Sequence, residues 1–213
     1  MSSAASHAAL QASALALDIH GVGRVTGWSA RFAPGLSLVV DEEGECKTAL
    51  LRLLAGEAAP RAGTVRWGGA DVAALSAAER AGRIFWRDPR TPWPDLSPEQ
   101  WMQQQAAHHP AWRAAEGPAH VQGLGLAEHM HKEMFRLSTG SQRKVLLAAA
   151  LASAAPLTLI DEPEAALDWA SIRYLRKVLA GEARRCRESG RVIVVANFEP
   201  IPEVPWGQVL RLA

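Results

Sequence analysis

The most recognisable chemistry of this chain lies at Lys47 and Thr48, which follow an apolar run and a glycine, Gly44. A phosphate-binding loop has Gly, four residues, Gly, Lys and Ser or Thr, because its backbone N–H groups wrap around the phosphates. In that pattern Lys47 would reach the β- and γ-phosphates, and the Thr48 hydroxyl would meet Mg²⁺. Asp41 and Cys46 replace the first and last glycines, so the segment alone is typical of an ordinary strand-to-helix turn.

The side chains around this loop oppose phosphate binding. Cys46 puts a side chain where the backbone should approach the phosphates most closely. Two like charges about 6 Å apart at an effective dielectric near 20 repel by roughly 3 kcal/mol, which weakens binding about a hundredfold. We therefore expect weak binding of a polyanion, although a carboxylate that points to solvent would cost little. The carboxylates set against the single Lys47 are those of Asp41, Glu42, Glu43 and Glu45.

A second candidate group is the carboxylate pair Asp161-Glu162, which directly follows the apolar run 157–160. That run predicts a buried strand, so the pair would lie at the carboxyl edge of a sheet, where α/β proteins bind ligands. The alternative is an acidic cap on the helix that follows. Upstream, Leu-Ser-Thr-Gly at 137–140 is by itself typical of a capping turn.

The elements that would position these residues alternate between strand and helix. The alternation predicts an α/β fold with a mostly parallel sheet. Residues 1–13 are expected to form a frayed tail. Strands are expected at 15–19, 29–32, 36–40, 63–67, 84–86, 157–161 and 191–196, and helices at 47–55, 98–108, 118–130, 141–154 and 169–186.

Length and composition limit the class of protein. The 213 residues fit one domain, with a helical lobe inserted at about 88–136. A formal charge of +1 gives no global field that would favour nucleic acid as a partner. Two cysteines, Cys46 and Cys186, are too few for a disulfide framework and fit a reducing compartment.

No part of the sequence predicts a membrane span, because no run of eighteen or more apolar residues occurs. The Ala/Ser-rich start lacks the basic residues of a secretory signal. Any membrane role is therefore expected to come through a partner. The histidines at 108–109 and 129–131 are expected to be exposed helix-end residues rather than metal ligands.

Taken in order, the elements at 44–48, 137–141, 161–163 and 166–168 resemble the ATP-binding cassette of ABC transporters. The resemblance runs over nearly the whole chain. It implies one domain over 1–213 with a P-loop NTPase fold of ABC type. That fold is α/β, with an N-terminal antiparallel β part, a mostly parallel sheet and an inserted helical lobe. ATP and Mg²⁺ are the ligands that the resemblance implies.

The resemblance also implies the roles of single residues. Glu162 would be the catalytic base that polarises the attacking water, and Asp161 with Thr48 would hold Mg²⁺. Ser138 and Gly140 would contact the γ-phosphate of a nucleotide held by a second subunit. The remaining nucleotide contacts would come from Gly44, Glu45, Cys46, Lys47, Thr48 and Ala49.

Two accessory positions depart from the family pattern. Arg87 stands where the family has a glutamine that contacts Mg²⁺. A cation cannot ligate the metal, although Arg87 could pair with a phosphate or with Asp88. Asn197 stands where the family has a histidine that contacts the γ-phosphate, and no histidine follows His131. Asn197 could supply one neutral hydrogen bond at most.

The function implied by the resemblance is the ATP-binding subunit of an ABC-type transporter, cytoplasmic and held on the inner face of the cell membrane by separate membrane-spanning subunits. Two copies, or this chain and a homologue, would sandwich ATP. The compact length and residues 137–144 resemble the cassette of the cytochrome c biogenesis haem exporter. The alternative is a degenerate cassette with weak or no ATPase activity that serves as a structural or regulatory partner. Hydrolysis, if present, is expected to be slow or partner-dependent.

Overall fold

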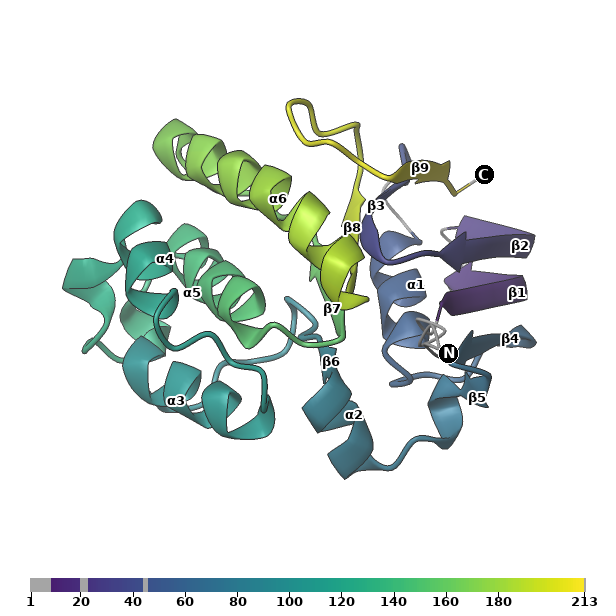
Figure 1. Ribbon diagram of the computed structural model, residues 1–213, viewed down its shortest axis with the longest axis horizontal. Coiled ribbons are helices and arrows are strands. Elements are labelled where there is room, and N and C mark those ends of the chain that lie inside the picture. The colour runs from purple at the N-terminus through teal and green to yellow at the C-terminus, as the bar shows by residue number, and fades with distance from the viewer. Residues whose placement is uncertain (1–8, 20–22, 44–45, 213) are drawn as a thin grey trace, which may run out of the picture.

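The computed structural model describes residues 9–19, 23–43 and 46–212, which form two sheets with helices between and beside them (Figure 1). All four strand pairings of the larger sheet are parallel. This confirms the expected parallel sheet. Its strands, in spatial order, are β6 (Ile84–Phe85), β7 (Leu157–Asp161), β8 (Val192–Asn197), β3 (Gly35–Val40) and β9 (Gln208–Arg211).

The smaller sheet is antiparallel and lies at the amino-terminal end of the chain, as the resemblance implies. Helix α1 (Lys47–Leu54) lies between the two sheets (Figure 1). Apolar residues of both sheets and of this helix form one buried cluster, so the antiparallel sheet covers one side of α1. The strands of this sheet are β2 (Gly23–Phe32), β1 (Leu10–Ile19), β4 (Ala62–Trp67) and β5 (Ala70–Asp71).

The other face of the parallel sheet is covered by α5 (Thr139–Ser153) and α6 (Trp169–Ser189). Successive residues of β8 alternate between the two clusters: Ile193 packs with α5 and α6, whereas Val194 packs with α1. Burial of both faces explains why the central strands are apolar without interruption.

The remaining helices are α2 (Ala77–Arg83), α3 (Pro98–His108) and α4 (Gly117–Gly123). Helices α3 and α4 pack against α5, on the side of the molecule away from the antiparallel sheet (Figure 1). Within the described residues, none of the helices combines the length and apolar character needed to cross a bilayer.

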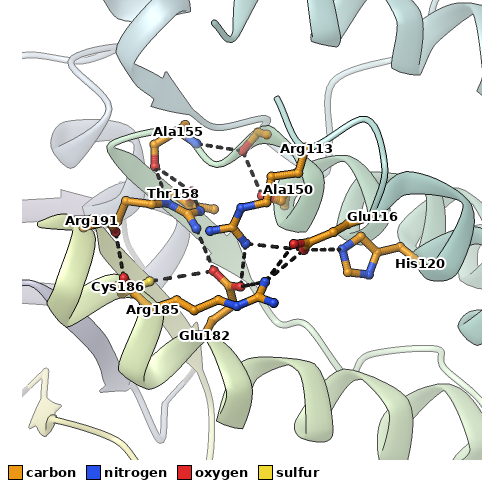
Figure 2. Close-up of polar contacts among 12 residues, drawn as sticks. Arg113, Glu116, His120, Ala150, Ala155, Thr158, Glu182, Arg185, Cys186 and Arg191 are labelled. Carbon is orange, nitrogen blue, oxygen red and sulfur yellow. Dashed lines mark hydrogen bonds and ion pairs between the residues drawn. The ribbon is translucent and has the colours of Figure 1, made fainter. Parts of the chain in front are cut away.

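A buried charge cluster ties the segment before α4 to α6 and β8 (Figure 2). The Glu182 carboxylate of α6 accepts hydrogen bonds from Arg113 and Arg191, each at 2.6 Å, and from Arg185 at 3.2 Å. Arg191 also donates to the Ala155 carbonyl at 3.1 Å. The single negative charge of Glu182 is thus surrounded by three arginines, of which Arg185 lies on the same helix.

Three expected elements are wrong in extent, the first being the strand expected at 29–32, which is β2 and begins at Gly23. Residues 9–13 do not belong to a tail, because β1 begins at Leu10, which is fully buried; residues 1–8 lie outside the described residues. The helix expected over 118–130 ends at Gly123, and Gly125 adopts a φ of +66° that breaks the helical path. Helix α2, with a capping box between Ser76 and Glu79, was not expected.

Candidate functional site

The candidate site lies at the carboxyl edge of β7, β8 and β3, where three neighbouring strands end. Pairing in register places Asp161 beside Ala196 and Val40 beside Asn197. Beyond the strands, the backbone N–H of Asp41 donates to the Asn197 carbonyl at 2.9 Å, and that of Glu162 donates to the Ala196 carbonyl at 2.8 Å. The sheet therefore brings the start of the 41–47 loop and the carboxylate pair to one edge.

Two side-chain contacts join the loop to the carboxylate pair. The Lys47 Nζ lies 2.8 Å from Glu162 Oε1, and Lys47 is only 4% exposed. The Thr48 hydroxyl donates to Asp161 Oδ2 at 2.5 Å. Because a buried ammonium needs a counter-charge, Glu162 neutralises Lys47 in this state.

Asp161 retains an unused ligand atom. Its Oδ1 is buried and has no hydrogen-bond partner among the described residues. Burial raises the pKa of Asp161, and the hydrogen bond from Thr48 only partly offsets that effect. A buried carboxylate oxygen beside a threonine hydroxyl offers the hard oxygen ligands that Mg²⁺ prefers, so these two residues fit such a cation.

Asp41 does not point away from the loop. Its Oδ2 accepts hydrogen bonds from the backbone N–H of Cys46 at 2.7 Å and of Lys47 at 2.9 Å. The residue is only 4% exposed. Its carboxylate therefore caps the N-terminus of α1, where a negative charge is favourable. Two other expected contact residues, Gly44 and Glu45, lie outside the described residues.

Ala49, in the first turn of α1, lines a cleft between that helix and β1. Ala16 and Leu17 of β1 and the aliphatic part of the 58–60 loop form its other walls. Ala49 is half-buried and carries no polar side chain. Any contribution to ligand binding must therefore come from its backbone and from the shape of this cleft.

Ser138 and Gly140 lie at the start of α5, against the turn that follows β7. The Ser138 Oγ accepts the backbone N–H of Ser141 at 3.1 Å and so caps the helix. A Cβ added to Gly140 would lie 2.3 Å from the carbonyl oxygen of Ala166. Only glycine allows this approach, so its type is explained by packing against the 162–168 turn.

Arg143 has a role at the site that its motif did not predict. Its Nη1 donates to the backbone carbonyl of Asp161 at 2.9 Å and to that of Glu162 at 2.6 Å. Glu162 has a φ of +42°, an unusual conformation for a residue with a Cβ. Arg143 thus holds the strained end of β7. The only signal in the sequence was a cation one turn into the helix after Ser138.

Comparison with known proteins decides the family of this fold and site. The ABC transporter family model matches residues 37–165, which span the loop, the Ser138–Gly140 turn and the carboxylate pair. The chain belongs to the ABC transporter family, as its ATP-binding cassette.

The relatives of this cassette include the cytochrome c biogenesis ATP-binding export protein CcmA of Rhodospirillum rubrum. That protein is 36% identical over 191 residues, covering 87% of this chain and 78% of the relative. A putative ABC transporter ATP-binding protein from Pyrococcus furiosus has a TM-score of 0.75 at 17% identity, covering 96% of this chain and 97% of that one. A dimeric bacterial ABC transporter cassette has a TM-score of 0.74 at 16% identity, covering 95% and 94%. The two structures show a shared fold.

The two altered positions of this cassette both point into their own loops. The Arg87 guanidinium donates to the carbonyls of Thr91 and Pro92, at 2.8 and 3.0 Å, and lies 4.1 Å from the Trp93 ring centroid. Asp88 instead forms ion pairs with Arg90, at 2.9 Å, and with Arg52, at 4.0 Å.

Asn197 is buried, and its Nδ2 donates to the Glu199 carbonyl at 2.9 Å. Its amide is therefore used within the loop that follows β8. In the described state, neither Arg87 nor Asn197 directs a side-chain hydrogen bond to Asp161 or Glu162.

Proposed function

We propose that this cassette binds MgATP at the edge of β3, β7 and β8 and hydrolyses it slowly, to drive export by separate membrane-spanning subunits. The observation that carries the proposal is the meeting of Lys47 with Glu162, at 2.8 Å, and of Thr48 with Asp161, at 2.5 Å. The Oδ1 of Asp161, which has no partner in the part of the chain that the structure describes, supports a metal-bound state as the one that completes the site.

The proposed chemistry divides between these four side chains. Thr48 and Asp161 would hold Mg²⁺, which when bound neutralises phosphate charge and orients the triphosphate. Lys47 would leave Glu162 for the β- and γ-phosphates. Glu162, freed from its ion pair, would accept a proton from the attacking water. The ion pair thus keeps the base occupied until a phosphate competes for the lysine.

A second copy of the cassette would complete the site. Ser138 is exposed at the N-terminus of α5, where backbone N–H groups and the helix dipole favour an anion. The dimeric cassette among the similar structures supports this arrangement. Membrane association would then follow from the transporter subunits that ABC cassettes serve, which places the chain on the inner face of the membrane.

The export step that we propose is the one in cytochrome c biogenesis. The support is the name and the 36% identity of the relative from Rhodospirillum rubrum. Haem would be the transported substrate. Expression of this chain in a bacterium that lacks its own cytochrome c biogenesis export ATPase tests the assignment. Recovery of haem-stained cytochrome c supports it, and a stably expressed chain that restores none contradicts it.

A second candidate function is a degenerate cassette that binds nucleotide weakly and acts as a structural partner. Specific observations favour it: the Asp41 carboxylate occupies two amides of the loop, and Asn197 uses its amide within its own loop. This candidate predicts that the chain supports a partner cassette even when Glu162 is replaced.

The test that separates the two candidates is a comparison of the wild type with Glu162→Gln. If the chain is an ATPase, we expect ATP turnover of Glu162→Gln with the membrane subunits to be at least about a hundredfold below that of the wild type, because the general base is lost. MgATP binding, followed by tryptophan fluorescence, should persist in the variant. Equal turnover of both proteins would contradict catalysis by Glu162. Equal export by both would favour the structural candidate.

A further inference from the structure

The groups that would bind a cation and the groups that would bind a phosphate differ in whether they already have a partner. On the metal side, Asp161 Oδ1 is buried and unpartnered within the described residues. On the phosphate side, the amides of Cys46 and Lys47 are both bound by Asp41, at 2.7 and 2.9 Å. The same site is therefore open to a cation and closed to an anion.

We propose that Asp41 is an internal anion which occupies the loop amides that a nucleotide phosphate requires, and that it thereby sets the nucleotide affinity of this cassette. The proposal rests on the proposed function, because it assigns a determinant of affinity to the same site. Binding of ATP would require the carboxylate of Asp41 to leave the amides of Cys46 and Lys47.

The competition follows from the number of protons available. Each backbone N–H has one proton, and at 2.7 to 2.9 Å that proton is committed to the Asp41 oxygen. A phosphate oxygen needs the same proton for a charge-assisted hydrogen bond. The two anions would also repel each other if both stayed. One must therefore exclude the other.

Three features of Asp41 make its carboxylate an effective competitor of phosphate for these amides. Its side chain is intramolecular and 4% exposed, so it meets the amides without a loss of translational freedom. Its backbone N–H donates to the Asn197 carbonyl at 2.9 Å, which anchors the residue to β8. Its charge also lies at the N-terminus of the eight-residue helix α1, which favours an anion there.

The expected size of the effect follows from the population of the displaced state. If Asp41 is away from the amides in about 10% of molecules, the apparent affinity for ATP is about tenfold below the intrinsic one. If the fraction is about 1%, the reduction is about a hundredfold. Asp41→Asn keeps the shape of the side chain but removes the charge and weakens its hold on the amides.

The experiment compares Kd values for MgATP, by titration calorimetry, for the wild type, Asp41→Asn and Asp41→Ser. Glu43→Gln is the matched control, because it removes the same charge from an exposed neighbouring residue. We expect both Asp41 variants to bind MgATP at least about tenfold more tightly than the wild type. Glu43→Gln should change Kd by no more than about twofold, because exposed charges are screened by salt.

The outcomes separate this inference from the proposed function. Wild type that binds MgATP, with Asp41 variants that bind no more tightly, would refute the role of Asp41 alone. A gain of equal size in Glu43→Gln would also refute it, since general charge would then explain the effect. Absence of binding in all four proteins would refute both proposals.

Hydrogen exchange on the wild type provides a measurement that does not depend on the variants folding. The N-terminal amides of a helix lack acceptors within the helix, so they exchange quickly unless something caps them. We expect the amides of Cys46 and Lys47 to be protected without nucleotide. Rapid exchange of both amides in the ligand-free wild type would overturn the proposal.

Discussion

Two buried carboxylates of this cassette, Glu182 and Asp161, show how differently the same chemical group can be used. Both oxygens of Glu182 accept hydrogen bonds from arginines (Figure 2). Burial works to raise the pKa of Glu182, but Arg113, Arg191 and Arg185 outweigh it and hold the pKa below its ordinary value. Asp161 has one oxygen bound by Thr48 and one without a partner among the described residues, and burial raises its pKa.

The difference teaches which buried charge stabilises the fold and which awaits a ligand. A buried carboxylate with all its partners belongs to the scaffold, and its removal leaves the arginines uncompensated. A buried carboxylate that lacks such partners lowers the free energy of unfolding, and the rest of the fold must offset that loss. Such a cost is typical of sites that a cation completes. In the protein without ligand, we therefore expect removal of the Glu182 charge to lower the free energy of unfolding, and removal of the Asp161 charge to leave it unchanged or raise it.

The largest effect on stability is expected at Glu182, whose two oxygens are both bound by arginines. Glu182→Gln removes the charge that neutralises Arg113 and Arg191, so we expect a loss of about 3 kcal/mol in the free energy of unfolding. Urea denaturation at pH 7.5 measures it. The matched control is Glu188→Gln on the same helix, whose ion pair with Arg184 is exposed and should contribute less than about 0.5 kcal/mol. A loss below 1 kcal/mol in Glu182→Gln would show that the cluster is not a scaffold.

A smaller effect is expected at His109, a buried titratable group to which the residues that the structure describes offer no ion pair. It was expected to be an exposed helix-end residue, but it is 3% exposed, and its ring lies 5.5 Å from that of Phe85. Burial lowers the pKa of His109 to about 4. The unfolded chain, with a pKa near 6.5, therefore binds more protons between pH 6.5 and pH 4, so stability falls as the pH falls through that range.

From this residue we expect the wild type to lose about 2 kcal/mol between pH 7.5 and pH 5. Other groups titrate over the same interval, so the measured quantity is the difference between the wild type and His109→Phe, by urea denaturation at both pH values. The variant should lose about 2 kcal/mol less. Parallel losses in the two proteins would mean that His109 is accessible to protons in the folded state.

The elements that follow from local pattern were predictable. The helix that begins at Lys47 and the strand 157–161 were expected within one or two residues, because apolar periodicity and flanking turn residues determine them. The edge position of Asp161-Glu162 was also expected, and Lys47 lies beside that pair because parallel strands end at one edge of a sheet.

What the sequence did not predict depends on side-chain direction. Asp41 was expected only as a repulsive charge, and its turn toward the amides follows from how the loop leaves β3. Arg143 could not be assigned, because its partners are backbone carbonyls, which leave no mark in a sequence. The burial of His109 depends on how the end of α3 packs on Phe85, which is a tertiary contact.

The smallest change in the free energy of unfolding is expected at Asp161. Whether stability rises or falls there is the sharpest test of the contrast with Glu182. Asp161→Asn removes a charge that burial disfavours while keeping an acceptor for the Thr48 hydroxyl. We expect the ligand-free protein to be as stable as the wild type or more stable by about 1 kcal/mol. Asp168→Asn is the control, because the Asp168 charge is paired with Lys144 and mostly exposed, so its loss should lower stability by about 0.5 kcal/mol.

Thermal unfolding with and without MgATP completes this test. The wild type and Asp168→Asn should gain stability from MgATP, whereas Asp161→Asn should gain little, because the carboxylate that would hold the cation is gone. A ligand-free Asp161→Asn that is less stable than the wild type by 2 kcal/mol or more would place Asp161 with Glu182 in the scaffold. The unpartnered oxygen would then have no bearing on a ligand, and the contrast between the two carboxylates would fail.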